Sequence, residues 1–229
     1  MTEPLAIMLF AAGFGTRMGE LTRDRPKPLI DVNGRALIDY TLDLANAVRP
    51  PRIVANLHYL PDMLARHLSP LGVELSLEQP DILDTGGGLK AALGLLGTDP
   101  VITMNADAIW SGPNPLDCLM AAWDPARMDA LLVCVPLASA IGRIGSGDFD
   151  ADTAGRLRRG KSLVYGGIQI IKTDDVAAVP KRIFSLNEIW DKFQDRGRLF
   201  GLRYPGKWCD VGHPEGIRLA EMLLSEPHV

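Results

Sequence analysis

The sequence has few of the features that mark disulfide-rich, membrane-spanning or secreted proteins. Its 229 residues include 3 cysteines, Cys118, Cys134 and Cys209, an odd number without C-x-x-C spacing, which argues against a disulfide framework or a cysteine metal site. No apolar run approaches the roughly 20 residues of a membrane-spanning helix. Residues 1–4 lack the basic segment of a signal peptide. We therefore expect a protein of the reducing cytoplasm that has no membrane partner.

Basic charge is also not in excess. The chain carries 24 Lys and Arg against 28 Asp and Glu, a net charge of −4. Proteins that bind nucleic acid usually present a basic surface, so we expect no nucleic-acid partner, and any anion site must be local. The 4 histidines show neither an H-E-x-x-H motif nor paired metal spacing.

What the chain does have is a regular alternation of apolar strands and helical patterns through its first 136 residues. Strands are predicted at 5–10, 52–57, 73–77, 101–105 and 131–136, and helices at 36–48, 61–68, 88–96 and 116–123. This order predicts an α/β fold with a Rossmann-like, mostly parallel sheet flanked by helices. Ligands of such sheets bind outside the carboxyl ends of the strands.

From about residue 137 the rhythm changes, because glycines and charged residues interrupt the segment 142–161. We expect a small antiparallel excursion on the substrate side there, or a mobile flap. Further strands are predicted at 163–171 and 199–204, and helices at 186–193 and 214–224. No linker separates the parts, so we predict a single domain over 1–229, with a core at 1–136 and a second half at 137–229.

The loop that follows the first strand is the most informative segment. Gly13 and Gly15 let backbone N–H groups approach an anion, and Arg17 and Lys27 add positive charge beside them. Lys27 stands between two prolines, which we expect to hold the segment extended. The loop is therefore predicted to bind a nucleoside triphosphate.

Two familiar phosphate-binding motifs do not fit this loop. A P-loop requires G-x-x-x-x-G-K-[ST], but the sixth position from Gly13 is Met18, and Gly19 is followed by Glu20. The dinucleotide motif G-x-G-x-x-G also requires glycine where Met18 stands. An NAD-dependent oxidoreductase is therefore not indicated.

The segment 13–18, Gly-Phe-Gly-Thr-Arg-Met, together with the Pro-Lys-Pro at 26–28, resembles the signature of the sugar-1-phosphate nucleotidyltransferases. The resemblance implies a GT-A-like fold and the reaction of a nucleoside triphosphate with a sugar 1-phosphate, giving a nucleoside-diphosphate sugar and pyrophosphate. It implies catalytic roles for Arg17, Lys27 and Asp107. It also implies nucleotide contacts from Ala11, Ala12, Gly13, Gly15, Thr16, Arg17, Lys27, Gly87, Gly88 and Asn105.

The same resemblance implies Mg²⁺ as the cofactor. Asp107 follows the predicted buried strand 101–105, where a carboxylate faces the ligand crevice. Asp210 stands in Trp-Cys-Asp-Val-Gly, which matches the W-x-D-V-G segment that carries the family's second metal ligand. Magnesium prefers oxygen ligands and usually takes one or two carboxylates plus substrate phosphates. We expect Asp107 and Asp210 to form the metal pair.

A second glycine-rich segment, Thr-Gly-Gly-Gly at 85–88, is expected to be a loop that opens a helix and lies against the base and ribose. One glycine would suffice for a tight turn, so the excess suggests that a ligand approaches the backbone. The preceding Glu78 and Gln79 are candidates for contacts with the base edge.

On the sugar side, we predict contacts from Gly167, Asp148 and Asn187. The E-x-P segment that many hexose transferases of the family carry is absent, and the basic residues at 156–161 could hold a charged sugar substituent or form a solvated loop. The chain most resembles the N-acetylmuramate-1-phosphate uridylyltransferases of cell-wall recycling. Mannose-1-phosphate guanylyltransferases, phosphocholine cytidylyltransferases and a non-catalytic nucleotide-sugar-binding paralogue remain alternatives, and the chain could be a monomer or a homodimer.

Overall fold

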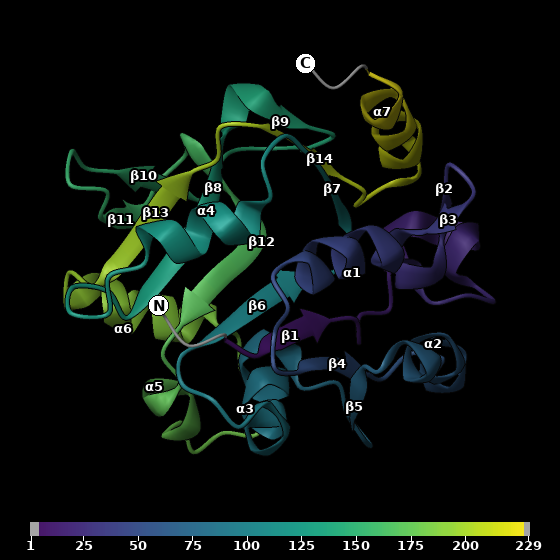
Figure 1. The fold of residues 1–229 in the computed structure, drawn as a ribbon, viewed down its shortest axis with the longest axis horizontal. Coiled ribbons are helices and arrows are strands. Elements are labelled where there is room, and N and C mark those ends of the chain that lie inside the picture. Colours follow the sequence, from purple (N-terminus) through teal and green to yellow (C-terminus); the bar gives the residue numbers. More distant parts are fainter. Residues whose placement is uncertain (1–4, 227–229) are drawn as a thin grey trace.

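A mixed nine-stranded sheet forms the centre of the computed structural model, which describes residues 5–226. From one edge the order is β13-β8-β12-β6-β1-β4-β5, with the pair β10-β11 joined to the start of β12 (Figure 1). The strands are β1 (Ile7–Phe10), β4 (Ile53–Leu57), β5 (Glu74–Leu77), β6 (Val101–Asn105), β8 (Ala130–Pro136), β10 (Phe149–Ala151), β11 (Leu157–Arg159), β12 (Leu163–Ile171) and β13 (Leu199–Arg203).

The parallel part of the sheet comes from the first half of the chain. β6, β1, β4 and β5 run parallel in adjacent positions, whereas β12 runs antiparallel between β6 and β8. Residues 1–136 and 137–229 therefore contribute strands to one sheet. Because the carboxyl ends of β1 and β6 lie side by side, the segments that follow them meet at one edge.

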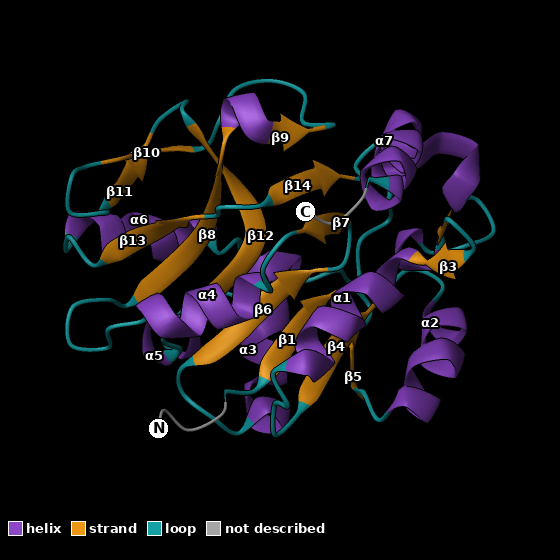
Figure 2. Cartoon of the chain, turned by 45° about the horizontal axis from the view of Figure 1, so that its top comes forward, coloured by secondary structure: helices purple, strands orange, loops and turns teal. Residues whose placement is uncertain are grey.

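Helices cover both faces of the sheet, as Figure 2 shows. One face packs against α1 (Leu37–Ala47), α2 (Pro61–Leu68) and α4 (Pro115–Ala122), and the other against α3 (Asp84–Leu96), α5 (Asp174–Ala177) and α6 (Asn187–Asp195). Alternation along β1 serves both layers, since Ile7 and Leu9 join the first core and Met8 joins the second. The α/β fold class expected from the sequence is confirmed.

A small second sheet closes the molecule near the carboxyl ends of the parallel strands. Its order is β7-β14-β9, with β7 (Ala108–Ser111), β14 (Lys207–Asp210) and β9 (Ala140–Ile141), and α7 (Pro214–Ser225) packs on it. A hairpin of β2 (Asp31–Val32) and β3 (Arg35–Ala36) turns at Asn33 and Gly34, both at positive φ. The sequence patterns did not reveal this sheet, because its strands are two to four residues long.

Most predicted strands and helices are present, and their ends differ from the expected ones by one or two residues. The segment 142–161 does form short antiparallel strands, β10 and β11. The expected loop at 85–88 is wrong, because α3 begins at Asp84 and all three glycines lie buried inside its first turns. They are there for packing: a Cβ on Gly87 would lie 2.3 Å from the backbone oxygen of Arg182.

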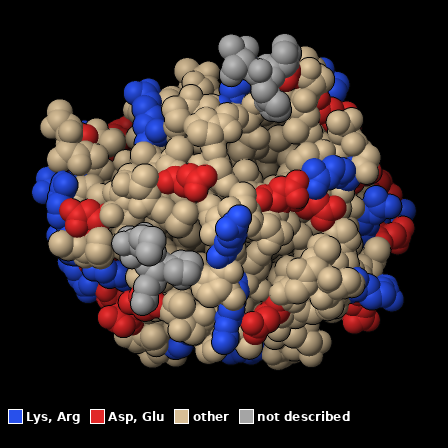
Figure 3. Space-filling model, viewed as in Figure 1, with Lys and Arg blue, Asp and Glu red and all other residues tan. Residues whose placement is uncertain are grey.

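The surface charge agrees with the composition. Basic and acidic side chains are interspersed on the face drawn in Figure 3, without a field of one sign. Among residues 5–226, no helix combines the length and apolar character needed to cross a bilayer.

Candidate active site

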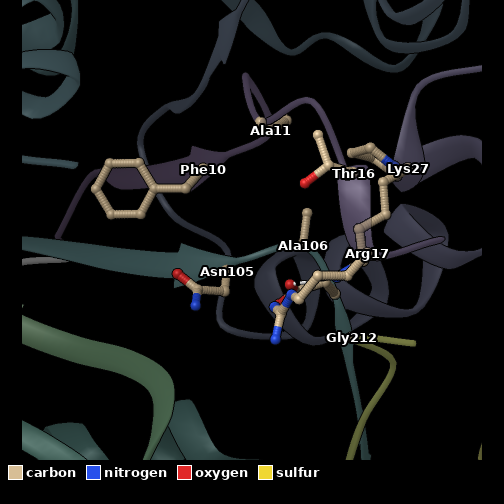
Figure 4. A pocket seen from close by; sticks show the side chains of 12 residues that line it. Phe10, Ala11, Thr16, Arg17, Lys27, Asn105, Ala106 and Gly212 are labelled. Carbon is tan, nitrogen blue, oxygen red and sulfur yellow. Dashed lines mark hydrogen bonds and ion pairs between the residues drawn. The ribbon is translucent and has the colours of Figure 1, made fainter. Parts of the chain in front are cut away.

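A cavity of about 230 Å³ opens at the carboxyl ends of β1 and β6 (Figure 4). It brings together the loop after β1, the Pro-Lys-Pro segment and the segment after β6. Its lining residues are Phe10, Ala11, Gly13, Gly15, Thr16, Arg17, Lys27, Pro28, Asn105, Ala106, Asp107 and Gly212. Eight of the predicted nucleotide and catalytic residues are among them, whereas Ala12, Gly87 and Gly88 are not.

The loop after β1 is shaped by its two glycines in different ways. A Cβ on Gly13 would meet nothing within 4 Å, so that side of the backbone is open to the cavity. Gly15 adopts φ +64°, and a Cβ there would lie 2.8 Å from the Cβ of Lys27. A short 3₁₀ helix, Thr16–Thr22, then carries Arg17. The loop therefore offers backbone N–H groups and one cation to an anion, as the sequence predicts.

Lys27 is the buried cation of the site, with 8% of its surface exposed. Pro26 before it is extended, but residues Lys27–Leu29 form a 3₁₀ turn, so the expectation of a fully extended segment is wrong. The Lys27 Nζ donates to Asp107 Oδ2 at 2.6 Å. The predicted catalytic lysine and the predicted metal ligand are thus paired directly.

The small sheet brings Asp210 beside Asp107. β14 pairs with β7 so that Asp210 lies opposite Ala108, and the Val211 N–H donates to the Asp107 carbonyl at 3.0 Å. Burial raises the pKa of the Asp210 carboxyl, and the charge of Asp107 raises it further. A Cβ on Gly212 would lie 2.9 Å from Asp210 Oδ1, so glycine leaves room for the carboxylate.

These two carboxylates fit the donor set of a magnesium site. They repel each other in a partly buried place, and a divalent cation would remove that repulsion. Within residues 5–226, no three or more His, Cys, Asp or Glu side chains cluster as a protein-only metal cage would. A metal held here would therefore share its coordination with phosphates, which is how magnesium is usually bound.

A second cavity, of about 360 Å³, adjoins the first and shares Phe10 and Asn105 with it. It is lined by Phe10, Asp84, Thr85, Asn105, Arg143, Asp148, Arg159, Tyr165, Ser185, Leu186, Asn187 and Trp190. Two of the predicted sugar-contact residues, Asp148 and Asn187, lie in this wall. Gly167 does not, but it supports the wall: at φ +90° it packs against Asn105, whose Cβ would be 2.9 Å from an added methyl group.

The floor of the second cavity is held by buried polar contacts. Trp190 donates its Nε1–H to Gln169 Oε1 at 2.8 Å, and Gln169 in turn donates to Thr103 Oγ1 at 3.1 Å. Asp148 accepts from Arg143 Nη2 and from the Tyr165 N–H, both at 2.9 Å. Such satisfied networks fix side chains in one arrangement.

One supporting network was only partly foreseen from the sequence. The Ala11 N–H donates to Asn56 Oδ1 at 2.8 Å, and Asn56 Nδ2 donates to Glu78 Oε1 at 2.7 Å. Glu78 is 1% exposed, and its other oxygen accepts from the Leu83 N–H. Glu78 therefore does not face the site as a base contact; it ties the loop after β1 to the start of α3. A Cβ on Gly88 would lie 2.6 Å from Glu78 Oε1, so the glycine makes room for this network.

Several lining residues were not predicted, chiefly Phe10, Arg143, Arg159 and Trp190. From the sequence, Phe10 was expected only as the end of the strand at 5–10, and Trp190 only as part of the helix at 186–193. The cluster of basic residues at 156–161 was the one available signal for Arg159, and it did not single out one arginine.

Comparison with known proteins identifies the family. Residues 7–140 match the MobA-like NTP transferase domain. The chain belongs to this family. It is a nucleotidyltransferase, and the reaction class predicted from the opening loop is confirmed.

Relatives of this nucleotidyltransferase align over nearly the whole chain. N-acetylmuramate alpha-1-phosphate uridylyltransferase of Caulobacter vibrioides is 38% identical over 97% of this chain and 98% of its own length. The enzyme of the same name from Neisseria meningitidis is 29% identical, over 94% and 96%. A probable mannose-1-phosphate guanylyltransferase 1 of Oryza sativa is 24% identical over 93% of this chain, but only 63% of its own length is matched.

Solved structures confirm the fold. HddC from Yersinia pseudotuberculosis, complexed with GMP-PN, superposes with a TM-score of 0.77 at 22% identity, covering 96% of this chain and all of HddC (100%). A UDP-glucose pyrophosphorylase complexed with UDP-glucose also gives 0.77, at 16% identity over 96% and 98%. Both proteins share the fold of this chain.

Proposed function

We propose that the chain transfers a uridylyl group from UTP to N-acetylmuramate 1-phosphate and releases pyrophosphate. The observation that carries this proposal is the 38% identity to the Caulobacter uridylyltransferase over 97% of this chain, at matching length. The mannose-1-phosphate guanylyltransferase from Oryza sativa is less similar and extends well beyond the matched region.

The first cavity suits a triphosphate. Arg17 and the N–H groups of the loop after β1 would hold the β- and γ-phosphates, with the α-phosphate near Lys27. An oxygen of the sugar phosphate attacks the α-phosphorus in line, and pyrophosphate leaves on the opposite side. The attacking group is already ionised, so no protein nucleophile is needed. Catalysis then rests on positioning and on neutralising charge.

Lys27 has a second task in this scheme. Its ammonium group pairs with Asp107 in the structure, and it would turn toward the α-phosphate and the incoming sugar phosphate when both are bound. Asp107 and Asp210 would then hold Mg²⁺, which when bound offsets the negative charge that gathers on the phosphates. Burial and then the negative charge of Asp107 raise the pKa of Asp210, and this supports the assignment.

The second cavity suits the sugar. It adjoins the first at Phe10 and Asn105, so a sugar there could present its phosphate toward Lys27 and Asp107. Asp148 and Asn187 line it and Gly167 supports its wall, which supports their assignment to the sugar side. Asn105 contacts both cavities and would lie near the bond that forms.

The test is pyrophosphate release measured with each of the four NTPs against a panel of sugar 1-phosphates and phosphocholine, with and without Mg²⁺. We expect magnesium-dependent turnover that is highest with UTP and N-acetylmuramate 1-phosphate. Preference for GTP with mannose 1-phosphate, or for CTP with phosphocholine, would replace the substrate assignment. Binding of a nucleotide sugar without any pyrophosphate release would indicate a non-catalytic paralogue.

A further inference from the structure

Arg159, the last residue of β11, lines the second cavity, and several contacts orient its guanidinium group. Its Nε and Nη2 donate to Asp191 Oδ1 at 2.9 and 2.7 Å, and Nη2 also donates to the Asn187 carbonyl at 3.2 Å. The guanidinium carbon lies 5.0 Å from the centre of the Phe149 ring. An arginine fixed by an acid and an aromatic face loses little conformational freedom when it binds a ligand.

The guanidinium group of Arg159 can donate further hydrogen bonds. Its hydrogen bonds to residues 5–226 use only Nε and Nη2, so both protons of Nη1 remain available to a ligand. The other arginine of the cavity, Arg143, is also incompletely satisfied, because its buried Nε lacks a partner in the described part of the chain. A buried donor without an acceptor is unfavourable, and a ligand with acceptor oxygens would relieve it.

Most carboxylate oxygens in the same cavity wall already accept a hydrogen bond from the protein. Both oxygens of Asp148 are engaged, one by Arg143 and the other by the Tyr165 N–H. One oxygen of Asp84 accepts from Thr85, which leaves its second oxygen for a sugar hydroxyl. The cavity therefore keeps guanidinium N–H groups available beside carboxylates that already accept hydrogen bonds, and this suits a ligand that brings a carboxylate of its own.

We propose that Arg159 is a specificity residue, which recognises a carboxylate substituent on the sugar by donating from Nη1. The inference rests on the proposed function. The 1-phosphate is accounted for by Lys27, which lines the first cavity, whereas Arg159 lines only the second. An anionic group on the far side of the sugar ring is what Arg159 can reach, such as the lactyl carboxylate that distinguishes N-acetylmuramate from N-acetylglucosamine.

The chain offers a matched control in the neighbouring Arg158. It belongs to the same strand, but alternation places its side chain on the opposite face, and it does not line the cavity. Both arginines are exposed. Replacing each by methionine removes the same charge from the same strand, only one of them from the cavity.

The experiment measures kcat and KM of wild type, Arg159→Met, Arg159→Lys and Arg158→Met with N-acetylmuramate 1-phosphate and with N-acetylglucosamine 1-phosphate. For Arg159→Met we expect the KM of the carboxylated sugar to rise about tenfold or more, as for a lost charge-assisted hydrogen bond. The kcat and the kinetics with the neutral sugar should change little. Arg159→Lys should recover only part of the affinity, because it keeps the charge without the planar fork. Arg158→Met should behave as wild type.

The outcomes separate this inference from the proposed function. If wild type uses the carboxylated sugar and Arg159→Met loses nothing, or loses equally with both sugars, Arg159 does not read the carboxylate and the inference is overturned while the function stands. If wild type prefers the neutral sugar, both the substrate assignment and the inference fail. Binding of the two nucleotide sugars, measured by calorimetry, supplies the same comparison without turnover, and thermal unfolding shows whether each variant is folded.

Discussion

Two clusters of charged residues lie at opposite ends of the strands of the central sheet, and their charges are compensated to different degrees. At the amino-end edge of β8, Asp129 accepts from Lys172 Nζ at 3.0 Å and from Arg198 Nε at 2.8 Å, and its side chain is 13% exposed. At the carboxyl-end edge of β6, Asp107 pairs with Lys27 and faces Asp210. The first cluster gives one carboxylate two cations, and the second gives two carboxylates one direct partner.

The pKa shifts express this difference. Burial alone would raise the pKa of Asp129, but the hydrogen bonds from Arg198 and Lys172 outweigh it and lower the pKa. For Asp210, burial and the charge of Asp107 raise the pKa, and Lys27, Arg17 and Arg143 offset this only in part. The structural cluster is complete within the chain, whereas the cluster of the candidate active site still favours an added cation. Incomplete charge compensation therefore separates a binding site from a structural ion pair in this fold.

The largest expected effect comes from removing the cation of the active-site cluster. Lys27→Met should lower kcat by about 10²–10³, since a preorganised charge at a phosphoryl centre is typically worth that much. The fold should persist, because Lys27 lines the cavity and methionine keeps most of the aliphatic length of its side chain. Steady-state pyrophosphate release and thermal unfolding measure the two effects separately.

The control for this variant is Arg23→Met in the same segment. Arg23 pairs with Glu20 on the surface, with side chains 65% and 78% exposed, and should keep normal turnover. Near-normal kcat in Lys27→Met would show that the Lys27–Asp107 pair is merely structural, like the pair at Asp129.

The next effect is on stability at the opposite edge. Asp129→Asn should lower the free energy of unfolding near neutral pH by about 1–3 kcal/mol, because two cations lose a charged acceptor. A lowered folded-state pKa contributes stability that is present above the unfolded pKa and is lost as pH falls through the folded value. The difference in free energy of unfolding between wild type and variant should therefore shrink as the pH is lowered. Denaturant unfolding at a series of pH values would measure this.

Asp210→Asn is the matched variant in the active site, and its pH dependence should have the opposite sign. Because the folded pKa is raised, ionised Asp210 costs stability once pH rises through that value. Without added metal, Asp210→Asn should be no less stable than wild type at neutral pH. Equal destabilisation by both variants would remove the distinction between the clusters.

How far the sequence predicts the fold and site depends on the length of each pattern. The strands and helices of the parallel half were predicted because apolar strands alternate there regularly with helical patterns. The opening loop was recognised because Gly13, Gly15, Arg17 and Lys27 have few other uses at that spacing. The β7–β14 pairing was not predicted, since the two strands lie about a hundred positions apart and outside that alternation. The motif predicted Asp210 and its pairing with Asp107, and the structure shows the strand pairing that brings the two residues together.

The glycines at 86–88 show why residue type alone misleads. From the sequence, three glycines in a row indicate a loop open to a ligand. In the fold they are buried in the first turns of α3, where Phe184, Arg182 and Glu78 occupy the space that side chains would need. Close backbone approach was predicted correctly, but the approaching atoms belong to the protein.

The smallest effect that we expect is on metal binding without nucleotide. Lys27 Nζ donates to Asp107 Oδ2 at 2.6 Å, so it competes for the carboxylate that would bind Mg²⁺. Lys27→Met should therefore bind Mn²⁺ alone, without nucleotide, a few-fold more tightly than wild type although its catalysis is lost. Lys27→Arg keeps the positive charge and should show no gain. Calorimetric titration with Mn²⁺ measures this directly. Unchanged or weaker Mn²⁺ binding in Lys27→Met would mean that Lys27 and the metal do not share Asp107. The charges of the active-site cluster would then be compensated within the protein, like those of the cluster at Asp129.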